Sequence, residues 1–225
     1  MLKAVLFDYG GTLDSDGTPW LERFFPLYQK AGLKTPFGDF QKAFYDSDDH
    51  LPERFDLRGL DLEKTLSLQT GCVIGRLAPA RKDIADSVAR AFTDDCRKNF
   101  KLNRPLLEKL AARYRLGIVS NFYGNLSDIL KAEGLSDLFG VVADSGVVGC
   151  IKPEKKIFLH ATDALGVSPH EALMVGDSPH RDMRGAENAG MPHAWIAGDR
   201  PDRAPCCPQA KVLRSVRDLG PWLLS

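Results

Sequence analysis

Several acidic, hydroxyl, amide and lysine residues and two glycines in this sequence lie at or near the ends of short apolar segments, where buried strands would end. The set comprises Asp8, Gly10, Gly11, Thr12, Ser120, Asn121, Lys152, Asp177 and Asp182. Carboxylate oxygens are the ligands that hard divalent cations prefer. Hydroxyl groups, backbone N–H groups and a lysine ammonium stabilise the negative charge of a phosphate. Together these residue types predict a site for a phosphate group beside a divalent cation.

The segments that would position these residues alternate between strand and helix patterns. Apolar runs that end in small or polar residues predict strands at 3–7, 116–119, 141–143, 173–175 and 194–197. Helical patterns, several with proline near the start and glycine near the end, lie at 105–114, 126–134, 153–166 and 179–190. This alternation predicts a parallel sheet with helices on both faces. Ligands bind outside the carboxyl ends of such strands, so the sheet would bring the polar residues together.

Residues from about 15 to 103 interrupt the alternation. They contain helical patterns at 20–31, 37–45, 62–70 and 79–100, and no convincing strand. Apolar residues recur at helical spacing in 20–31, which indicates packing against neighbouring helices rather than a ligand site. We therefore expect a helical module after the first strand, followed by the rest of the sheet.

The composition excludes several classes of protein. Of 225 residues, 44% are hydrophobic and 27% charged, and 30 basic side chains balance 30 acidic ones. These values are typical of a globular protein, and the basic excess of a nucleic-acid-binding protein is missing. The apolar run at 1–7 is too short for a signal peptide or a membrane span. We therefore expect a cytoplasmic protein that binds neither nucleic acid nor membrane.

The cysteines are odd in number and show no CxxC spacing, so we expect reduced thiols. They are Cys72, Cys96, Cys150, Cys206 and Cys207. Cys206 and Cys207 belong to the proline-rich segment 198–208 and have no His or Cys partner at metal-ligand spacing. For these two cysteines we expect a solvent-facing loop.

Four motifs resemble, in order, those of the haloacid dehalogenase-like hydrolase superfamily, and the resemblance covers essentially the whole chain. The family's first motif, an apolar strand followed by Asp-x-Asp-x-Thr, is matched by residues 5–14 except at Gly10. The second, an apolar strand ending in Ser or Thr, is matched by residues 117–121. Lys152, followed by proline, matches the third. Residues 174–182 match the fourth, Gly-Asp after an apolar strand with another Asp a few residues later.

The resemblance implies a fold and a domain organisation. The fold would be α/β, a three-layer Rossmann-like parallel sheet core with an inserted all-helical cap domain. The core would comprise residues 1–14 and 103–225, and the cap residues 15–102.

The resemblance also implies a Mg²⁺-dependent hydrolase. Asp8 would attack phosphorus and form an aspartyl-phosphate that water then hydrolyses, with Ser120 and Lys152 as further catalytic residues. The implied metal ligands are Asp8, the backbone carbonyl of Gly10, Asp177 and Asp182. The implied phosphate-binding residues are Gly11, Thr12, Ser120, Asn121 and Lys152.

Gly10 departs from the family pattern, in which this position is usually an aspartate. That aspartate acts as acid and base. Positioned proton transfer contributes typically about 10²–10⁴-fold to a rate. A leaving group of low pKa, a replacement residue or a loss of turnover would each accommodate the glycine. Candidate replacements are Asp14, Asp16, His180 and the cap segment 46–54, which holds Asp46, Asp48, Asp49, His50 and Glu53. The other histidines, His160, His170 and His193, show no metal-ligand pairing and are expected to be structural.

The favoured function is a phosphatase acting on a small phosphorylated metabolite. A phosphonate or haloacid hydrolase of the same superfamily is one alternative, and Lys30, Lys34 and Lys42 are cap lysines that a phosphonate hydrolase could use. A phosphate-binding or regulatory protein with impaired turnover is another. The sequence has neither a P-loop nor a Gly-x-Ser-x-Gly elbow, and it does not indicate an oligomeric state or a substrate.

Overall fold

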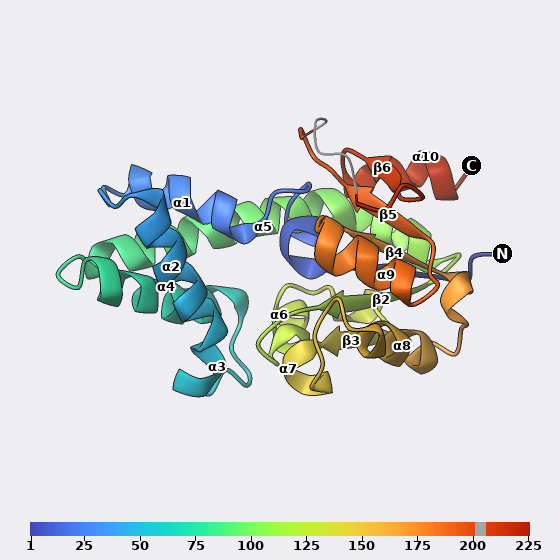
Figure 1. Ribbon diagram of the computed structural model, residues 1–225, viewed down its shortest axis with the longest axis horizontal. Coiled ribbons are helices and arrows are strands. Elements are labelled where there is room, and N and C mark those ends of the chain that lie inside the picture. The colour runs from blue at the N-terminus through green and yellow to red at the C-terminus, as the bar shows by residue number, and fades with distance from the viewer. Residues whose placement is uncertain (201–205) are drawn as a thin grey trace.

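The computed structural model describes residues 1–200 and 206–225 and consists of a sheet-containing core at one end and a bundle of helices at the other (Figure 1). The strands are β1 (Ala4–Phe7), β2 (Arg115–Ser120), β3 (Val141–Asp144), β4 (Ala172–Gly176), β5 (His193–Ile196) and β6 (Lys211–Leu213). They form one parallel sheet in the order β3-β2-β1-β4-β5-β6. The predicted fold class is confirmed, and five of its strands were predicted. The sixth, β6, has only three residues, too short for a pattern to reveal it.

Alternate residues of the central strand β1 pack into different layers. Val5 and Phe7 contact the layer that contains α5 (Lys82–Ala111), α6 (Leu126–Ala132) and α10 (Leu219–Leu223). Ala4 and Leu6 contact the opposite layer, which contains α8 (Lys155–Ala164) and α9 (Arg184–Asn188). All four side chains are fully buried, as expected for a parallel strand covered on both faces.

The remaining helices and short turns connect these layers or build the helical part. They are α1 (Trp20–Lys30), α2 (Phe37–Asp49), α3 (Leu51–Arg54), α4 (Leu62–Leu77), α7 (Ser145–Val148), η1 (Tyr9–Leu13), η2 (Ser136–Leu138), η3 (Pro169–Glu171), η4 (Pro179–Met183) and η5 (Val216–Asp218). In the helical part, Phe24 of α1 stacks on Phe92 of α5 with ring centroids 3.8 Å apart. The apolar face of α1 therefore packs against helices, as its spacing predicts.

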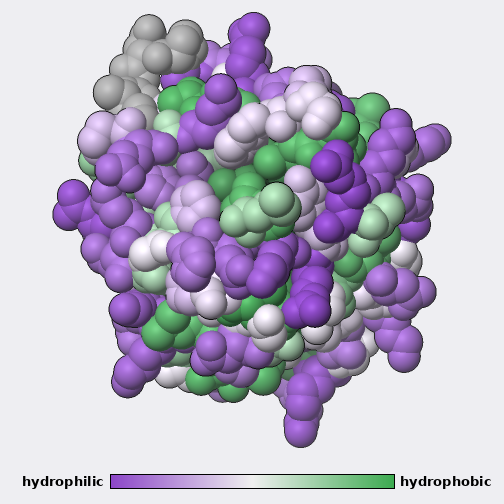
Figure 2. All heavy atoms as spheres, turned by 90° about the vertical axis from the view of Figure 1, so that its right-hand side faces the viewer, coloured by the Kyte–Doolittle hydropathy of each residue, from purple (hydrophilic) through white to green (hydrophobic). Residues whose placement is uncertain are grey.

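The carboxyl ends of the strands point toward the helical part (Figure 1). On the opposite end of the core, hydrophilic side chains cover most of the surface and hydrophobic ones form only small patches (Figure 2). None of the helices in the described part of the chain has the length and apolar character needed to cross a bilayer. The strand ends, where ligands bind in parallel sheets of this kind, therefore face the helical cap.

Helix α5 differs from the sequence prediction, which placed two helices at 79–100 and 105–114. One helix of 30 residues runs from Lys82 to Ala111 with Pro105 inside it. Proline usually ends a helix because it lacks an N–H group. Here the buried face continues on both sides of the proline, through Phe100, Leu107 and Leu110. This helix runs through the boundary expected between residues 102 and 103, so the cap and the core share it.

The expectation for the two neighbouring cysteines is correct for one of them. Cys206 is exposed, but Cys207 is fully buried and packs in a small cluster with Met183 and Trp195. A thiol is a small apolar side chain that suits such a cluster, and the solvent-facing interpretation was wrong for Cys207. Residues 201–205 of the expected loop lie outside the described residues.

Asn103 joins three segments at the point where α5 passes from cap to core. It is fully buried; its amide donates to the carbonyl of Leu13 at 3.1 Å and accepts from Arg217 at 2.9 Å. Leaving a buried polar group unpaired costs about 1–3 kcal/mol, so we expect Asn103→Ala to lower the free energy of unfolding by at least that order. Asn99→Ala, one turn earlier with a local bond to Asp95, should stay within about 0.5 kcal/mol. Denaturant titration of both variants measures the difference, and equal losses would contradict the bridging role.

Candidate active site

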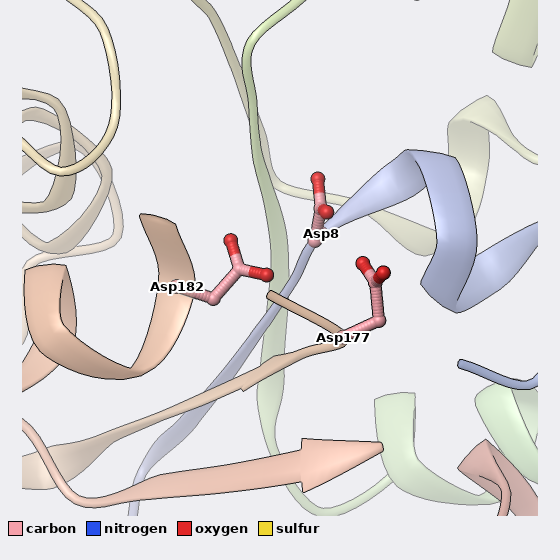
Figure 3. Close-up of side chains that lie close together, drawn as sticks. All are labelled: Asp8, Asp177 and Asp182. Carbon is pink, nitrogen blue, oxygen red and sulfur yellow. The ribbon is translucent and has the colours of Figure 1, made fainter. Parts of the chain in front are cut away.

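Three aspartates from separate segments converge at the carboxyl end of the sheet (Figure 3). Asp8 directly follows β1, Asp177 directly follows β4, and Asp182 lies in η4. One carboxylate oxygen from each lies within 4.8 Å of the others, and all three residues are buried. Adjacent parallel strands end at the same edge of the sheet, and this brings together residues about 170 positions apart in the chain.

Lys152 lies between two of these carboxylates. Its Nζ is 2.7 Å from Asp8 Oδ1 and 2.7 Å from Asp182 Oδ1. Burial by itself would lower the pKa of Lys152, but the negative charges of Asp182 and Asp8 raise it overall. The ammonium therefore remains charged and partly neutralises the cluster.

Asn121 holds the main chain of this lysine. Its side-chain oxygen accepts from the Lys152 N–H at 2.7 Å, and its side-chain nitrogen donates to the Lys152 carbonyl at 3.1 Å. The amide is thus engaged on both sides in positioning Lys152. Asn121 also lines the neighbouring cavity.

The two oxygens of Asp8 differ in their surroundings. Oδ1 accepts from the N–H of Tyr9 at 2.7 Å and from the hydroxyl of Ser120 at 3.1 Å, in addition to Lys152. Oδ2 has no hydrogen bond within the described part of the chain. Hydrogen bonds to one oxygen fix the orientation of the carboxylate and leave the other oxygen available.

Asp177 carries the least compensated charge of the cluster. Its Oδ1 accepts a long 3.5 Å hydrogen bond from Thr12. Its Oδ2 is buried without a hydrogen-bond partner among the described residues. Burial and then the neighbouring charges of Asp8 and Asp182 raise its pKa well above the ordinary value. An unpaired buried oxygen amid three carboxylates suits a hard divalent cation such as Mg²⁺.

Gly11 and Thr12 contact the side chains of Asp14 and Asp177 and lie outside the cavity. Gly11 has a positive φ of 90°, and a Cβ there would lie 2.6 Å from the Asp177 carboxyl group, so only glycine fits. Its N–H donates to Asp14 Oδ1 at 2.6 Å. Neither Gly11 nor Thr12 lines the cavity beside Asp8, whereas Ser120, Asn121 and Lys152 do.

Trp20 occupies the space in which a side chain at position 10 would lie. A Cβ built on Gly10 would be 3.0 Å from the indole Nε1 of Trp20. The φ of Gly10 is −76°, so the backbone would accept other residues and the limit is steric. The indole is held in place by a 2.6 Å hydrogen bond from Nε1 to Asp14 Oδ2. The helical spacing of 20–31 concealed this second role of Trp20.

The candidate replacements near the motifs either bind other side chains or lie outside the cavity. Asp14 is fully buried and binds Arg23 at 2.8 Å in addition to Trp20 and Gly11. Asp16 forms an ion pair with Arg217. His180 is exposed and does not line the cavity.

The cap segment 46–54 contributes one acidic residue to the cavity. Asp46 forms ion pairs with Arg54 and Arg76, and Asp49 is exposed. Asp48 is half-buried, accepts a hydrogen bond from the hydroxyl of Tyr123 and lines the cavity.

The cavity itself has a volume of about 120 Å³ and lies between the cap and the strand ends. Typical ligand pockets measure roughly 300–1,000 Å³, so this one suits a small molecule. Its lining consists of Asp8, Gly10, Pro19, Trp20, Leu21, Phe44, Tyr45, Asp48, Ser120, Asn121, Phe122, Tyr123, Lys152 and Arg181. The sequence did not reveal that Arg181 and five aromatic residues line the cavity. The aromatic residues are Trp20, Phe44, Tyr45, Phe122 and Tyr123. The position of Arg181 directly before Asp182, an expected metal ligand, was the one feature of the sequence that indicated its place at the site.

A family model described as haloacid dehalogenase-like hydrolase matches residues 2–190, which is most of the chain. The chain belongs to this family. The crystal structure of a HAD phosphatase from Thermococcus onnurineus superimposes with a TM-score of 0.60 at 28% identity and covers 99% of this chain and 98% of that one. The motif resemblance is thereby confirmed at the level of the family and its helical insertion.

Two relatives of this chain are named as phosphatases. A phosphoserine phosphatase of Thermus thermophilus is 37% identical over 147 residues, which make up 62% of this chain and 57% of the relative. A glyceraldehyde 3-phosphate phosphatase of Methanothermobacter thermautotrophicus is 30% identical over 200 residues, 85% of this chain and 84% of the relative. The chain thus spans little more than half of the first relative and most of the second.

Adding a methyl group at Gly10 tests the contact with Trp20. Overpacking costs typically about 1–3 kcal/mol, and we expect Gly10→Ala to destabilise the protein by that order. The cost should shrink in a Trp20→Phe background, because the smaller ring leaves room. Denaturant unfolding of the four proteins in a double-mutant cycle measures the coupling. Gly75→Ala, where an added Cβ meets no atom within 4 Å, is the control, and an equal cost in both backgrounds would refute the contact.

Asp177→Asn should make the metal-free protein more stable at neutral pH, because it removes a buried charge whose pKa is raised by burial and by Asp8 and Asp182. Since that folded-state pKa is raised, the penalty exists at high pH and disappears as the pH falls and the carboxyl gains its proton. The stability advantage of the variant should therefore shrink in acid.

Thermal unfolding in EDTA and in Mg²⁺ measures both effects for this variant. The wild-type protein should gain stability from Mg²⁺, and Asp177→Asn should lose most of that gain. Asp163→Asn, at an exposed position of α8, should leave both the metal-free stability and the Mg²⁺ response unchanged. A Mg²⁺ shift that survives Asp177→Asn would exclude this carboxylate as a ligand.

Proposed function

We propose that this hydrolase is a Mg²⁺-dependent phosphatase that acts on a small organophosphate through an aspartyl-phosphate on Asp8. The observation that carries the proposal is the cluster of Asp8, Asp177 and Asp182, buried within 4.8 Å of one another beside Lys152. A site that gathers oxygen ligands for a cation and a lysine for an anion suits phosphoryl transfer.

Asp8 is the proposed nucleophile. Ser120, Lys152 and the N–H of Tyr9 bind Oδ1 and direct Oδ2 toward a substrate. The proposed metal ligands are Asp8, the Gly10 carbonyl, Asp177 and Asp182, and when bound the cation neutralises charge on the phosphoryl group. The proposed phosphate-binding residues are Ser120, Asn121 and Lys152, which line the cavity, together with Gly11 and Thr12 in an indirect role. Within this set, Gly11 and Thr12 act by supporting Asp14 and Asp177, since they bind those side chains.

The reaction divides one displacement into two. In the first step a bond forms between Asp8 Oδ2 and phosphorus while the bond from phosphorus to the leaving oxygen breaks. Lys152 keeps its proton and stabilises the negative charge, because its pKa is raised by the two carboxylates despite its burial. In the second step water attacks phosphorus, and the Asp8 carboxylate and inorganic phosphate are released.

A small phosphorylated metabolite fits the cavity best. The volume of about 120 Å³ leaves little room beyond a phosphate and a short carbon chain. The names of the two relatives, phosphoserine phosphatase and glyceraldehyde 3-phosphate phosphatase, denote substrates of this size. Arg181 lines the cavity and adds positive charge where an anionic substrate would enter.

The alternative chemistries have less support. Displacement of halide needs no cation, whereas Asp177 has an unpaired buried oxygen that calls for one. A phosphonate hydrolase would require a cap lysine at the substrate, but Lys30, Lys34 and Lys42 are all exposed and outside the cavity lining.

Purified protein tested with phosphoserine, glyceraldehyde 3-phosphate, 4-nitrophenyl phosphate, phosphonoacetaldehyde and a 2-haloacid decides between these functions. We expect phosphate release that requires Mg²⁺ and is lost by several orders of magnitude in Asp8→Asn, which removes the nucleophile. Asp163→Asn should retain full activity. Halide release in EDTA would overturn the proposal, and tight phosphate binding without turnover would favour a binding protein.

A further inference from the structure

The proposed reaction needs a proton donor that position 10 cannot supply. An alkoxide leaving group must gain a proton, and Gly10 has no side chain to provide one. Trp20 fills the adjacent space and its indole N–H already donates to Asp14. The proton must therefore come from another wall of the cavity.

Two carboxyl groups line the cavity within the described part of the chain, those of Asp8 and Asp48. Asp8 is the proposed nucleophile. Asp48 lies near the end of α2, so it reaches the cavity from the cap and lies across from the strand ends. A leaving group points away from the nucleophile in an in-line displacement, which places it on the cap side.

A hydrogen bond from the core fixes the position of Asp48. The hydroxyl of Tyr123, in the loop after β2, donates to Asp48 Oδ1, and Tyr123 also lines the cavity. Burial and the nearby Asp48 charge raise the pKa of Tyr123 well above its ordinary value, so this hydroxyl remains a donor. The contact joins cap and core at the site.

The other groups in the cavity wall that carry a proton either bind carboxylates already or are partly exposed to solvent. Lys152 is bound by two carboxylates and Ser120 donates to Asp8. Tyr45 is 47% exposed, and a phenol is a much weaker acid than a carboxyl group. Asp48 is the remaining group with a carboxyl function.

We propose that Asp48 is the catalytic acid and base of this enzyme, supplied by the cap in place of the side chain that Gly10 lacks. This inference rests on the proposed phosphatase function. The proposal gives the cap a chemical role in addition to enclosing the substrate.

The proton transfers balance over the two steps. As the bond from phosphorus to the leaving oxygen breaks, the protonated Asp48 carboxyl gives its proton to that oxygen, and an alcohol departs. The Asp48 carboxylate then accepts a proton from the water that attacks phosphorus. Asp8 and Asp48 both return to their initial states, and the products are an alcohol and inorganic phosphate.

The surroundings of Asp48 suit a group that gains and loses a proton near neutral pH. The pKa of Asp48 is raised to about 6: burial and the charge of Asp49 raise it, while the hydrogen bond from Tyr123 and the charge of Arg181 oppose the shift. Asp8 and Lys152 line the same cavity. General acids and bases work best with a pKa near the operating pH.

Substrates whose leaving groups differ in their need for a proton test whether Asp48 is the acid. We expect Asp48→Asn to lower kcat/KM by at least about 100-fold for phosphoserine and glyceraldehyde 3-phosphate, since positioned proton transfer is worth about 10²–10⁴-fold. The loss should be much smaller for 4-nitrophenyl phosphate, whose leaving group needs no proton. Asp86→Asn, at an exposed position of α5 in the cap, is the matched control and should preserve both rates.

The pH profile separates a catalytic role from a structural one. Because the acid must be protonated, the ratio of wild-type to Asp48→Asn kcat/KM for phosphoserine should fall as the pH rises through about 6. Because both proteins are measured on the same substrate, the effect of the substrate's own ionisation on the rate cancels in this ratio. The hydrogen bond from Tyr123 favours the charged carboxylate, so Tyr123→Phe should move this fall to higher pH.

The outcomes distinguish this inference from the proposed function. If phosphate release depends on Asp8 and Mg²⁺ but Asp48→Asn slows all substrates equally, the acid role of Asp48 is wrong and the phosphatase function stands. The same holds if Tyr45→Phe, rather than Asp48→Asn, creates the selective loss on alkyl phosphates. If no substrate shows release that depends on Asp8, both proposals fail together.

Discussion

The charge balance among Asp8, Asp177, Asp182 and Lys152 is the constraint on which the rest of the site depends. Three carboxylates buried this close repel one another, and burial of each charge is unfavourable by itself. Lys152 compensates two of them directly through 2.7 Å contacts, while Asp177 retains an oxygen without a partner among the described residues. The protein therefore holds an excess of negative charge that a cation would relieve, and this is how a sheet edge becomes a site for an anionic substrate.

The glycine at position 10, where the family usually has an aspartate, is packed against Trp20 as part of a network of side chains. Trp20 lies against Gly10 and donates to Asp14, which also binds Arg23 and the N–H of Gly11. The first turn of the chain beyond β1 is thereby fixed by hydrogen bonds among Gly11, Asp14, Trp20 and Arg23. A network of this kind leaves the geometry around Asp8 intact while it moves the supply of a proton to another part of the molecule.

Cap and core are coupled in two ways. The 30-residue helix α5 passes through both, and Asn103 ties it to Leu13 and Arg217 at the crossing point. Asp48 and Tyr123 form the second link, at the cavity itself. Since one partner of that pair comes from each part, any separation of cap from core would remove Asp48 from the site, and the proton donor would be present only when the substrate is enclosed.

The order of strands and helices, the motif residues and the family could be determined from the sequence, because hydrophobic periodicity and the chemistry of strand ends are local properties. Asp8, Ser120, Lys152, Asp177 and Asp182 meet as expected, since parallel strands share one edge. The tertiary structure alone decided which side chains share the cavity with them. Trp20 and Asp48 belong to helices whose sequence pattern is that of ordinary packing, and their positions depend on how the cap folds back over the strand ends. For the same reason, Asp14, Asp16 and His180 could not be distinguished from Asp48 in the sequence. The ion pairs of Asp14 with Arg23 and of Asp16 with Arg217, which is 201 residues away in the chain, form only in the folded protein.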